Sequence, residues 1–242
     1  MRTSVFAVAL SALPTLISAG TYFDWNFKNA SSSTELKDLS FPMSLANTPH
    51  EHGYYFAYQY TFSGIDQIGY GGLQPQKDKD GSSNFRAVFS SFADGTETSD
   101  DNCSGGADSS SSGASCGVYV DATYDHPYKL EIKNTHGTTW TGTIVDTVLG
   151  NSTHVGSYTL PSKAGGIKTS QVGFVEYFPL NSGGSCDDQT YTNITFYPPT
   201  TKSAGLSTGH LDKPYRSGDC GDKGHRDVDQ VENGGWQVTD GI

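Results

Sequence analysis

The chain has 242 residues and a formal net charge of −11 at pH 7. An acidic surface repels nucleic acid and anionic membranes, so neither is expected as a partner. The 14 Tyr, 12 Phe and 3 Trp can supply an aromatic core, whereas 29 Gly disfavour helices. These totals fit one large all-β domain.

The N-terminus has the features of a signal peptide. Arg2 supplies a positive start, residues 5–17 are largely apolar, and Ala19 is a small residue at the expected cut. The apolar stretch is too short to cross a bilayer. We therefore expect a secreted, extracellular protein in which residues 1–19 are removed. Residues 20–242 then form a single β-sandwich domain, monomeric, with a tail rich in loops from about residue 199.

Short runs of alternating apolar residues predict β-strands along the chain. The clearest run is residues 54–63. Its alternation predicts that the aromatic side faces a core and that Gln59 lies on the other side. Ten or so strands without helices predict an all-β fold, a two-sheet antiparallel β-sandwich of jelly-roll type. The predicted strands are residues 21–27, 39–45, 54–63, 68–74, 84–92 and 128–134, three runs within 138–179, then 192–197 and 236–238.

Four cysteines in an exported chain favour two disulfides, for which three pairings are possible. We favour Cys103 with Cys116 and Cys186 with Cys220, because each pair closes a loop rich in Gly, Ser and Asp. A zinc site is disfavoured because the sequence has no C-x-x-C pair. The sandwich is thus expected to be held together by disulfides.

Three Asn-x-Ser/Thr motifs are acceptors for glycans in a eukaryotic secretory pathway, at Asn29, Asn151 and Asn193. The last of them alternates with Ile194 in a predicted strand, which turns Asn193 outward. We therefore expect a glycoprotein.

Glu176 is a carboxylate on the more apolar side of its predicted strand, between Phe174 and Phe178. Breaks in a pattern tend to mark functional or strained sites. Glycoside hydrolysis needs two carboxyl groups about 5–9.5 Å apart, so Asp146 is the candidate partner and Tyr177 a further catalytic candidate. The alternative is a structural carboxylate, buried against an arginine or backbone donors.

Aromatic, amide and guanidinium groups on several strands suit the apolar faces and hydroxyls of a sugar. The alternative is that the aromatics form the core and the polar groups are solvated. A lyase reading would use Arg86, Gln171, His154 and Tyr177 as the neutralising group, acid and base. The candidate ligand-binding residues are Gln59, Tyr70, Gln74, Arg86, Trp140, His154 and Gln171.

No metal site is predicted. Asp100, Asp101 and Asp108 crowd one loop and offer oxygens of the kind that calcium prefers, but their spacing matches no EF-hand and a solvated loop is the simpler reading. His50 and His52 lack an identifiable third ligand for a catalytic zinc.

Several motifs follow one another along the chain, among them GYGGLQ (69–74), FRAVFSSF (85–92), TWTGTIVDT (139–147), GSYTLPSKAGGI (156–167) and SQVGFVEYF (170–178). In this order they resemble a family of secreted domains of unknown function in fungi and actinobacteria, sometimes found beside ricin-type lectin modules. The resemblance spans residues 21–198. It implies a secreted β-sandwich that acts at polysaccharides, and it carries no catalytic residues over to this chain.

Sequence and resemblance together predict a secreted protein that binds cell-wall or extracellular polysaccharide. One alternative is a polysaccharide-degrading enzyme, either a lyase or a glycoside hydrolase. The other is a non-catalytic secreted protein with a structural or host-interaction role.

Overall fold

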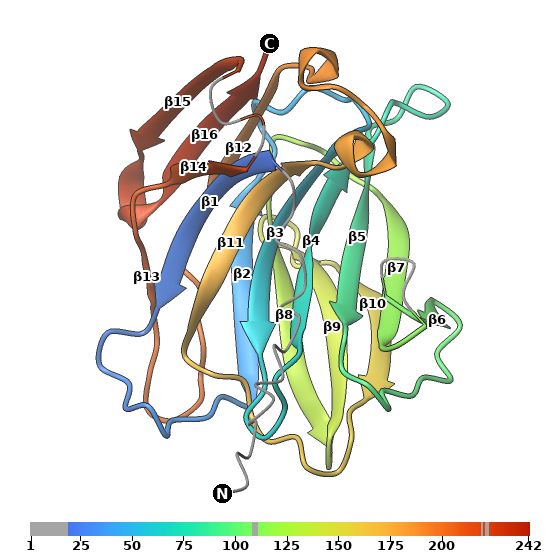
Figure 1. Ribbon diagram of the computed structural model, residues 1–242, viewed down its shortest axis with the longest axis vertical. Coiled ribbons are helices and arrows are strands. Elements are labelled where there is room, and N and C mark those ends of the chain that lie inside the picture. Colours follow the sequence, from blue (N-terminus) through green and yellow to red (C-terminus); the bar gives the residue numbers. More distant parts are fainter. Residues whose placement is uncertain (1–18, 108–110, 219, 221–222) are drawn as a thin grey trace, which may run out of the picture.

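The alternating runs form β-strands that pair into two antiparallel sheets, packed face to face, in a computed structural model that describes residues 19–107, 111–218, 220 and 223–242 (Figure 1). This confirms the predicted all-β sandwich. One sheet has nine strands in the order β13-β1-β11-β3-β4-β5-β7-β6, with β14 also paired to β1. The other has seven strands in the order β10-β9-β8-β2-β12-β16-β15.

Strand bounds follow the same two sheets. The nine-stranded sheet contains β1 (Ala19–Asn26), β3 (Tyr54–Thr61), β4 (Ile68–Pro75), β5 (Asn84–Ser91), β6 (Cys103–Gly105), β7 (Ala114–Asp121), β11 (Ser170–Tyr177), β13 (His210–Leu211) and β14 (Tyr215–Gly218). The seven-stranded sheet contains β2 (Asp38–Ser44), β8 (Pro127–His136), β9 (Thr139–Asp146), β10 (Ser152–Thr159), β12 (Thr192–Phe196), β15 (His225–Gln230) and β16 (Trp236–Gly241). The described residues also form three short 3-10 helices, η1 (Phe178–Ser182), η2 (Cys186–Asp188) and η3 (Glu232–Gly234).

The two ends of the chain bear on the predicted domain bounds. Residues 1–18 of the predicted signal peptide lie outside the described residues, and Ala19 is the first residue of β1. Beyond residue 199 the tail contributes β13, β14, β15 and β16, of which only the last was expected from the sequence.

Aromatic side chains fill the space between the sheets, as their alternation predicted. The rings of Phe41 and Tyr58 stack at 4.3 Å across the sandwich, and those of Phe89 and Tyr158 stack at 4.4 Å. Buried hydroxyls find partners: Tyr58 donates to the Tyr197 carbonyl at 2.8 Å. The core is therefore aromatic, and the buried Tyr58 hydroxyl does not lose its hydrogen bond on burial.

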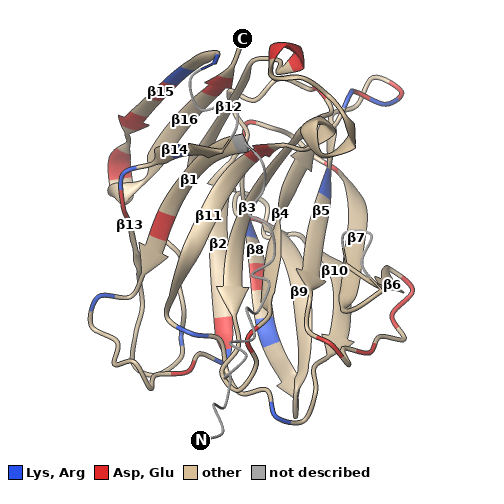
Figure 2. Ribbon diagram, viewed as in Figure 1, with Lys and Arg blue, Asp and Glu red and all other residues tan. Residues whose placement is uncertain are grey.

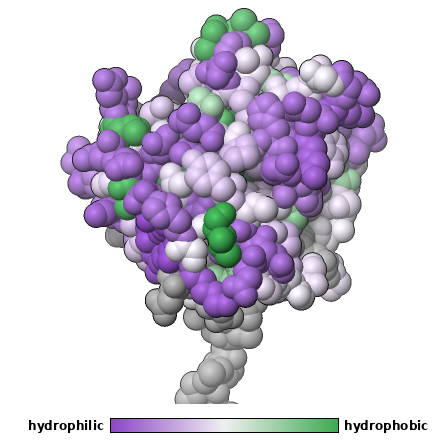
Figure 3. Space-filling view, turned by 90° about the horizontal axis from the view of Figure 1, so that it is seen from above, coloured by the Kyte–Doolittle hydropathy of each residue, from purple (hydrophilic) through white to green (hydrophobic). Residues whose placement is uncertain are grey.

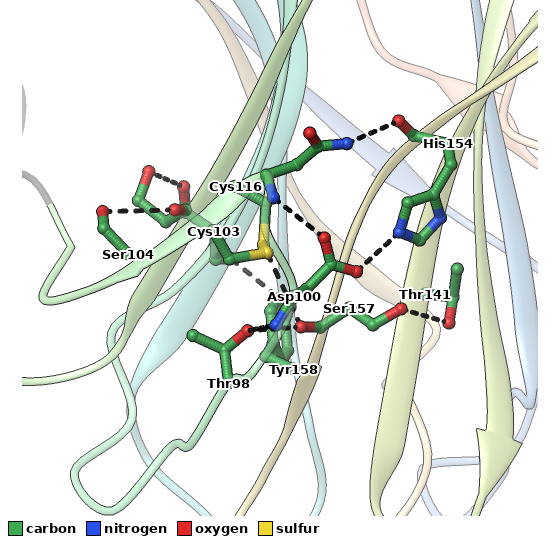
Figure 4. Close-up of a disulfide and its surroundings, with 12 residues drawn as sticks. Thr98, Asp100, Cys103, Ser104, Cys116, Thr141, His154, Ser157 and Tyr158 are labelled. Carbon is green, nitrogen blue, oxygen red and sulfur yellow. Dashed lines mark hydrogen bonds and ion pairs between the residues drawn. A yellow bond between two sulfur atoms is a disulfide. The ribbon is translucent and has the colours of Figure 1, made fainter.

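Both predicted disulfides are confirmed, Cys103–Cys116 and Cys186–Cys220. The first joins directly opposed residues of β6 and β7. It lies against β10, where a Cβ on Gly156 would come within 2.5 Å of the Cys103 Sγ (Figure 4). Two disulfides fit an oxidising compartment and are consistent with secretion.

The predicted glycan acceptors differ in accessibility. Asn29 and Asn151 are exposed. Asn193 is buried on β12, and its Nδ2 donates to the Thr239 Oγ1 at 3.1 Å. The expected alternation holds, because Ile194 and Phe196 are in the core and Asn193 is on the opposite face of β12, but neighbouring residues cover Asn193 on that face.

The face of the molecule seen in Figure 3 is mainly hydrophilic. Seen from above in Figure 3, hydrophobic side chains occur as separate small spots. Within the described ranges, no helix is long and apolar enough to cross a membrane.

Gly72 of β4 gives a test of strand packing. A Cβ there would lie 1.9 Å from the Phe56 carbonyl oxygen, whereas a Cβ on Gly105 of β6 would meet nothing within 4 Å. We expect Gly72→Ala to lower the free energy of unfolding by roughly 2 kcal/mol or more, because backbone must move. Gly105→Ala, the matched control, should change it by less than about 0.5 kcal/mol. Urea unfolding measures both, and equal small effects would contradict this packing.

Candidate functional site

The nine-stranded sheet has one face against the seven-stranded sheet and an opposite side, which we call the outer face (Figure 1). Side chains alternate between the two faces of a strand, so strand register arranges the outer-face residues in rows across the sheet. Three rows cross β1, β11, β3, β4 and β5. Few charged residues lie on these strands (Figure 2), which makes each of them informative.

The first row, here called the Glu176 row, is polar. Glu176 of β11 lies opposite Gly20 of β1 and Tyr55 of β3. Gln74 lies one position past the Phe56–Leu73 pair and opposite Arg86, which in turn faces Tyr119. The row in order is Gly20, Glu176, Tyr55, Gln74, Arg86 and Tyr119.

The second row is apolar and lies two residues along each strand. It consists of Tyr22, Phe174, Ala57, Gly72 and Val88. Together with Tyr55, its side chains form a second hydrophobic cluster, separate from the core between the sheets. The ring of Phe174 packs edge-on against that of Tyr55 at 5.7 Å. The outer face thus has an apolar strip of its own.

The third row is mixed. Gln59 lies opposite Tyr70, which faces Ser90, which faces Ser115. On the other side of Gln59, one position past the Gly173–Tyr58 pair, lies Val172, opposite Asp24. Gln59 is 8% exposed. The neighbours of Gln59 in register are thus the aliphatic Val172 on β11 and the aromatic Tyr70 on β4.

Glu176 is held at the end of β11, next to the helix η1. It is 7% exposed, and its Oε1 accepts a hydrogen bond from the Asn181 Nδ2 at 2.8 Å. The chain turns into η1 at Pro179, which has no N–H to continue a strand, and leaves it at Gly183, whose φ is +90°. This turn brings the Asn181 amide back over the carboxylate.

The charge of Glu176 acts on a neighbouring phenol. Burial, followed by the negative charges of Glu176 and Tyr215, raises the pKa of Tyr22 to about 12. The Tyr22 hydroxyl therefore keeps its proton at any physiological pH. Glu176, Asn181 and Tyr22 form a group that we call the Glu176 cluster.

The candidate catalytic residues do not meet in one place. Asp146 lies on β9 of the other sheet, so the expected carboxyl pair with Glu176 is not assembled. Tyr177 alternates with Glu176 and faces the core, where its ring packs against Tyr54 at 5.1 Å. Gln59 lies four residues along β3 from Tyr55, the neighbour of Glu176, a separation of roughly 13 Å.

The other candidate ligand-binding residues are divided between the outer face and elsewhere. Tyr70, Gln74 and Arg86 lie on the outer face with Gln59. Trp140 is 1% exposed and packs in the core, and Gln171 accepts a hydrogen bond at its Oε1 from the Val172 amide.

His154 lies on β10 of the seven-stranded sheet. Its Nε2 is 2.6 Å from the Asp100 Oδ2, beside the first disulfide (Figure 4). Asp108, one of the three aspartates considered for calcium, lies outside the described residues. Within the described residues no group of three or more His, Cys, Asp or Glu is placed to hold a metal ion.

Asp146 closes the turn between β9 and β10. Its Oδ1 accepts from the amides of Val148 and Leu149 at 2.8 and 3.0 Å, and its Oδ2 is 2.8 Å from the His126 Nδ1. Burial raises the pKa of Asp146, but the hydrogen bonds from the Leu149 amide, His126 and the Val148 amide outweigh it and lower the pKa below its usual value. Asp146 lines a cleft of about 570 Å³ at the edge of the sandwich.

Sequence reasoning missed three residues that the structure makes important: Asn181, Tyr22 and His126. Asn181 lies in a segment without strand or helix periodicity. Tyr22 belonged to an expected strand, but nothing in the sequence paired that strand with β11. His126 becomes notable only through a hydrogen bond to a residue 20 positions away.

Comparisons with known proteins give the following. No family model matches the chain, and no curated protein matches it. Two solved structures of scytalido-glutamic peptidase are similar, one with a transition-state analogue inhibitor (13% identity, 93% of this chain and 98% of that chain, TM-score 0.46). The other contains a peptide-based transition-state analogue (11% identity, 91% and 97%, TM-score 0.47).

A third similar structure is SCP-B, a member of the eqolisin family of peptidases, in a complex with the tripeptide Ala-Ile-His (10% identity, 92% and 98%, TM-score 0.45). Similarity at this level assigns neither an activity nor a residue role to this chain.

Two sequence predictions are corrected by these findings. The resemblance to secreted domains found beside lectin modules is wrong, because no family model matches and the similar structures are peptidases. The predicted polysaccharide-directed function and its two alternatives are also wrong, because the similar structures are peptidases. The glycines of the GYGGLQ motif, one support for the polysaccharide prediction, are explained by packing: a Cβ on Gly71 would meet Leu130, and one on Gly72 would meet the Phe56 backbone.

Asp146 provides a test of the acid sensitivity of the fold. Because its folded-state pKa is lowered, its contribution to stability is fully present above its ordinary pKa of about 4 and is lost as the pH falls through the folded-state value. We expect Asp146→Asn to destabilise the protein at pH 7 and to cost progressively less below about pH 4. Urea unfolding between pH 2.5 and 7 measures this, with the exposed Asp66→Asn as control. A cost that is independent of pH would contradict the assignment.

Proposed function

We propose that this protein acts outside the cell on polypeptides, binding extended segments on the outer face and hydrolysing a peptide bond at Glu176. The similar solved structures name the reaction class to be tested. The side chains of this chain support it.

The polar groups of the outer face match the chemistry of a peptide backbone. Gln59 and Gln74 each carry an amide that donates and accepts, as every peptide unit does. The apolar strip around Phe174 lies between their rows. Its own members are buried, and the partly exposed Tyr70 and Phe178 that pack against it offer apolar surface to the side chains of a bound segment. A few polar groups next to an apolar strip are what a binding site requires.

Glu176 supplies the acid–base group. As a carboxylate it takes a proton from a water molecule, whose oxygen bonds to the carbonyl carbon of the peptide. The carbonyl becomes an oxyanion, towards which the Tyr22 O–H can donate because its raised pKa keeps the proton in place. Glu176, now protonated, passes its proton to the amide nitrogen as the C–N bond breaks.

Asn181 keeps the carboxylate in position for these transfers. Its hydrogen bond occupies Oε1 and fixes the rotation of the carboxyl group. The single observation that supports the proposal most is this one: a carboxylate 7% exposed, oriented by an amide and bordered by an apolar strip on a sheet face that is not the core.

The proposal is tested by incubating the protein with a diverse peptide library between pH 3 and 7 and identifying cleaved bonds by mass spectrometry. We expect Glu176→Gln to lower the rate by about 10²- to 10⁴-fold, because the proton transfers are lost. Tyr22→Phe, which keeps the ring packing, should lower kcat by about 10²- to 10³-fold.

Glu232→Gln, at an exposed position on η3, is the matched control and should leave the rate unchanged. Cleavage that survives Glu176→Gln in a folded protein would rule out this residue. A wild-type protein that cleaves no peptide would rule out hydrolysis.

A further inference from the structure

Arg86 is held in one orientation on the outer face. Its Nη1 donates to the Gln74 Oε1 at 3.3 Å. Opposite Val88 in β7 stands Gly117, where a Cβ would lie 2.6 Å from the Arg86 Nη2 and 2.9 Å from its Cζ. Only the missing side chain of Gly117 lets the guanidinium lie against the β7 backbone. The Arg86 fork is thus positioned before any ligand arrives.

No carboxylate of the described chain lies within ion-pair distance of this guanidinium. The partners of the described ion pairs are lysines, histidines and Arg216, which lies 4.0 Å from Asp240. Arg86 is thus a half-buried cation without a carboxylate partner among the described residues. Gln74 takes one of its five N–H donors, which leaves others to bind an anion.

The distance between Arg86 and Glu176 indicates how far along a bound peptide an anionic group would lie from the bond at Glu176. Both lie in the Glu176 row, separated by the strand intervals β11–β3, β3–β4 and β4–β5. At about 4.8 Å per interval the separation is roughly 14 Å, which is the length of about four residues of extended peptide. A polypeptide crossing the sheet along this row therefore reaches Arg86 about four residues from the bond at Glu176.

We propose that Arg86 is a specificity-determining residue that binds a carboxylate of the substrate, about four residues from the cleaved bond. This inference rests on the proposed function. The carboxylate belongs either to an Asp or Glu side chain or to the C-terminus of the peptide, since the guanidinium fork fits both in the same bidentate way. Gln74 positions the fork and does not itself contact the carboxylate.

The test is peptide binding to the Glu176→Gln protein, in which cleavage does not interfere, followed by fluorescence anisotropy. Four labelled peptides are compared: one with Glu at the fourth position, one with Gln there, and short forms ending at that position as an acid or as an amide. We expect the carboxylate forms to bind about 10-fold or more tightly than their neutral counterparts.

Adding Arg86→Gln should abolish that preference while neutral peptides change by less than about twofold, and Arg86→Lys should restore part of it. Lys202→Gln is the matched control for loss of one positive charge, since Lys202 is exposed and its amide donates to Asp38 of β2, in the seven-stranded sheet. Thermal unfolding of each variant verifies that it is folded. Preference for the Glu peptide alone, or for the C-terminal acid alone, identifies which source is bound.

An unchanged preference in Arg86→Gln would overturn the inference, as would peptide binding with no preference for a carboxylate. A preference that depends on Arg86 in a protein that cleaves nothing would leave this inference standing and remove the proposed hydrolysis. Cleavage without any carboxylate preference would do the reverse. If no peptide binds, both are overturned.

Discussion

Close stacking of aromatic rings between the two sheets is the interaction on which the rest of the structure depends. Phe41 of β2 stacks on Tyr58 of β3, and Phe89 of β5 packs on Tyr158 of β10, so each sheet is held to the other by flat contacts. Aromatic side chains bury roughly 150–250 Å² each, which compensates for the modest aliphatic content of the chain. The Tyr58 and Tyr60 hydroxyls donate to backbone carbonyls, so their burial leaves no hydrogen-bond donor unsatisfied.

A core of this kind leaves the other side of the nine-stranded sheet available for a different task. On β11 the core takes Val175 and Tyr177, while Phe174 and Glu176 turn to the outer face. The same strand thus carries an apolar residue on both sides. The Glu176 cluster combines a carboxylate, an amide and a phenol on a rigid sheet, which is a better foundation for precise chemistry than a loop.

The sequence predicted those parts of the structure that depend on local alternation. The aromatic face of β3 follows from a period of two, and the disulfide pairing followed from loop composition. The orientation of β11 could not be predicted, because both of its faces contain large apolar residues. Strands such as β15, with the sequence HRDVDQ, show no apolar face at all and form by pairing with β16.

The first disulfide has a consequence for how the molecule behaves among copies of itself. Strand β6, of three residues, terminates the nine-stranded sheet, and its cystine packs on Gly156 of β10, the border strand of the opposite sheet. Asn102 adds a hydrogen bond from its Nδ2 to the His154 carbonyl on that same strand. Borders with open amides invite lateral pairing with a neighbour's strand. Here the disulfide and Asn102 hold the edge strand β6 against the edge strand β10. We expect this contact to disfavour edge-to-edge pairing between copies of the protein at high concentration.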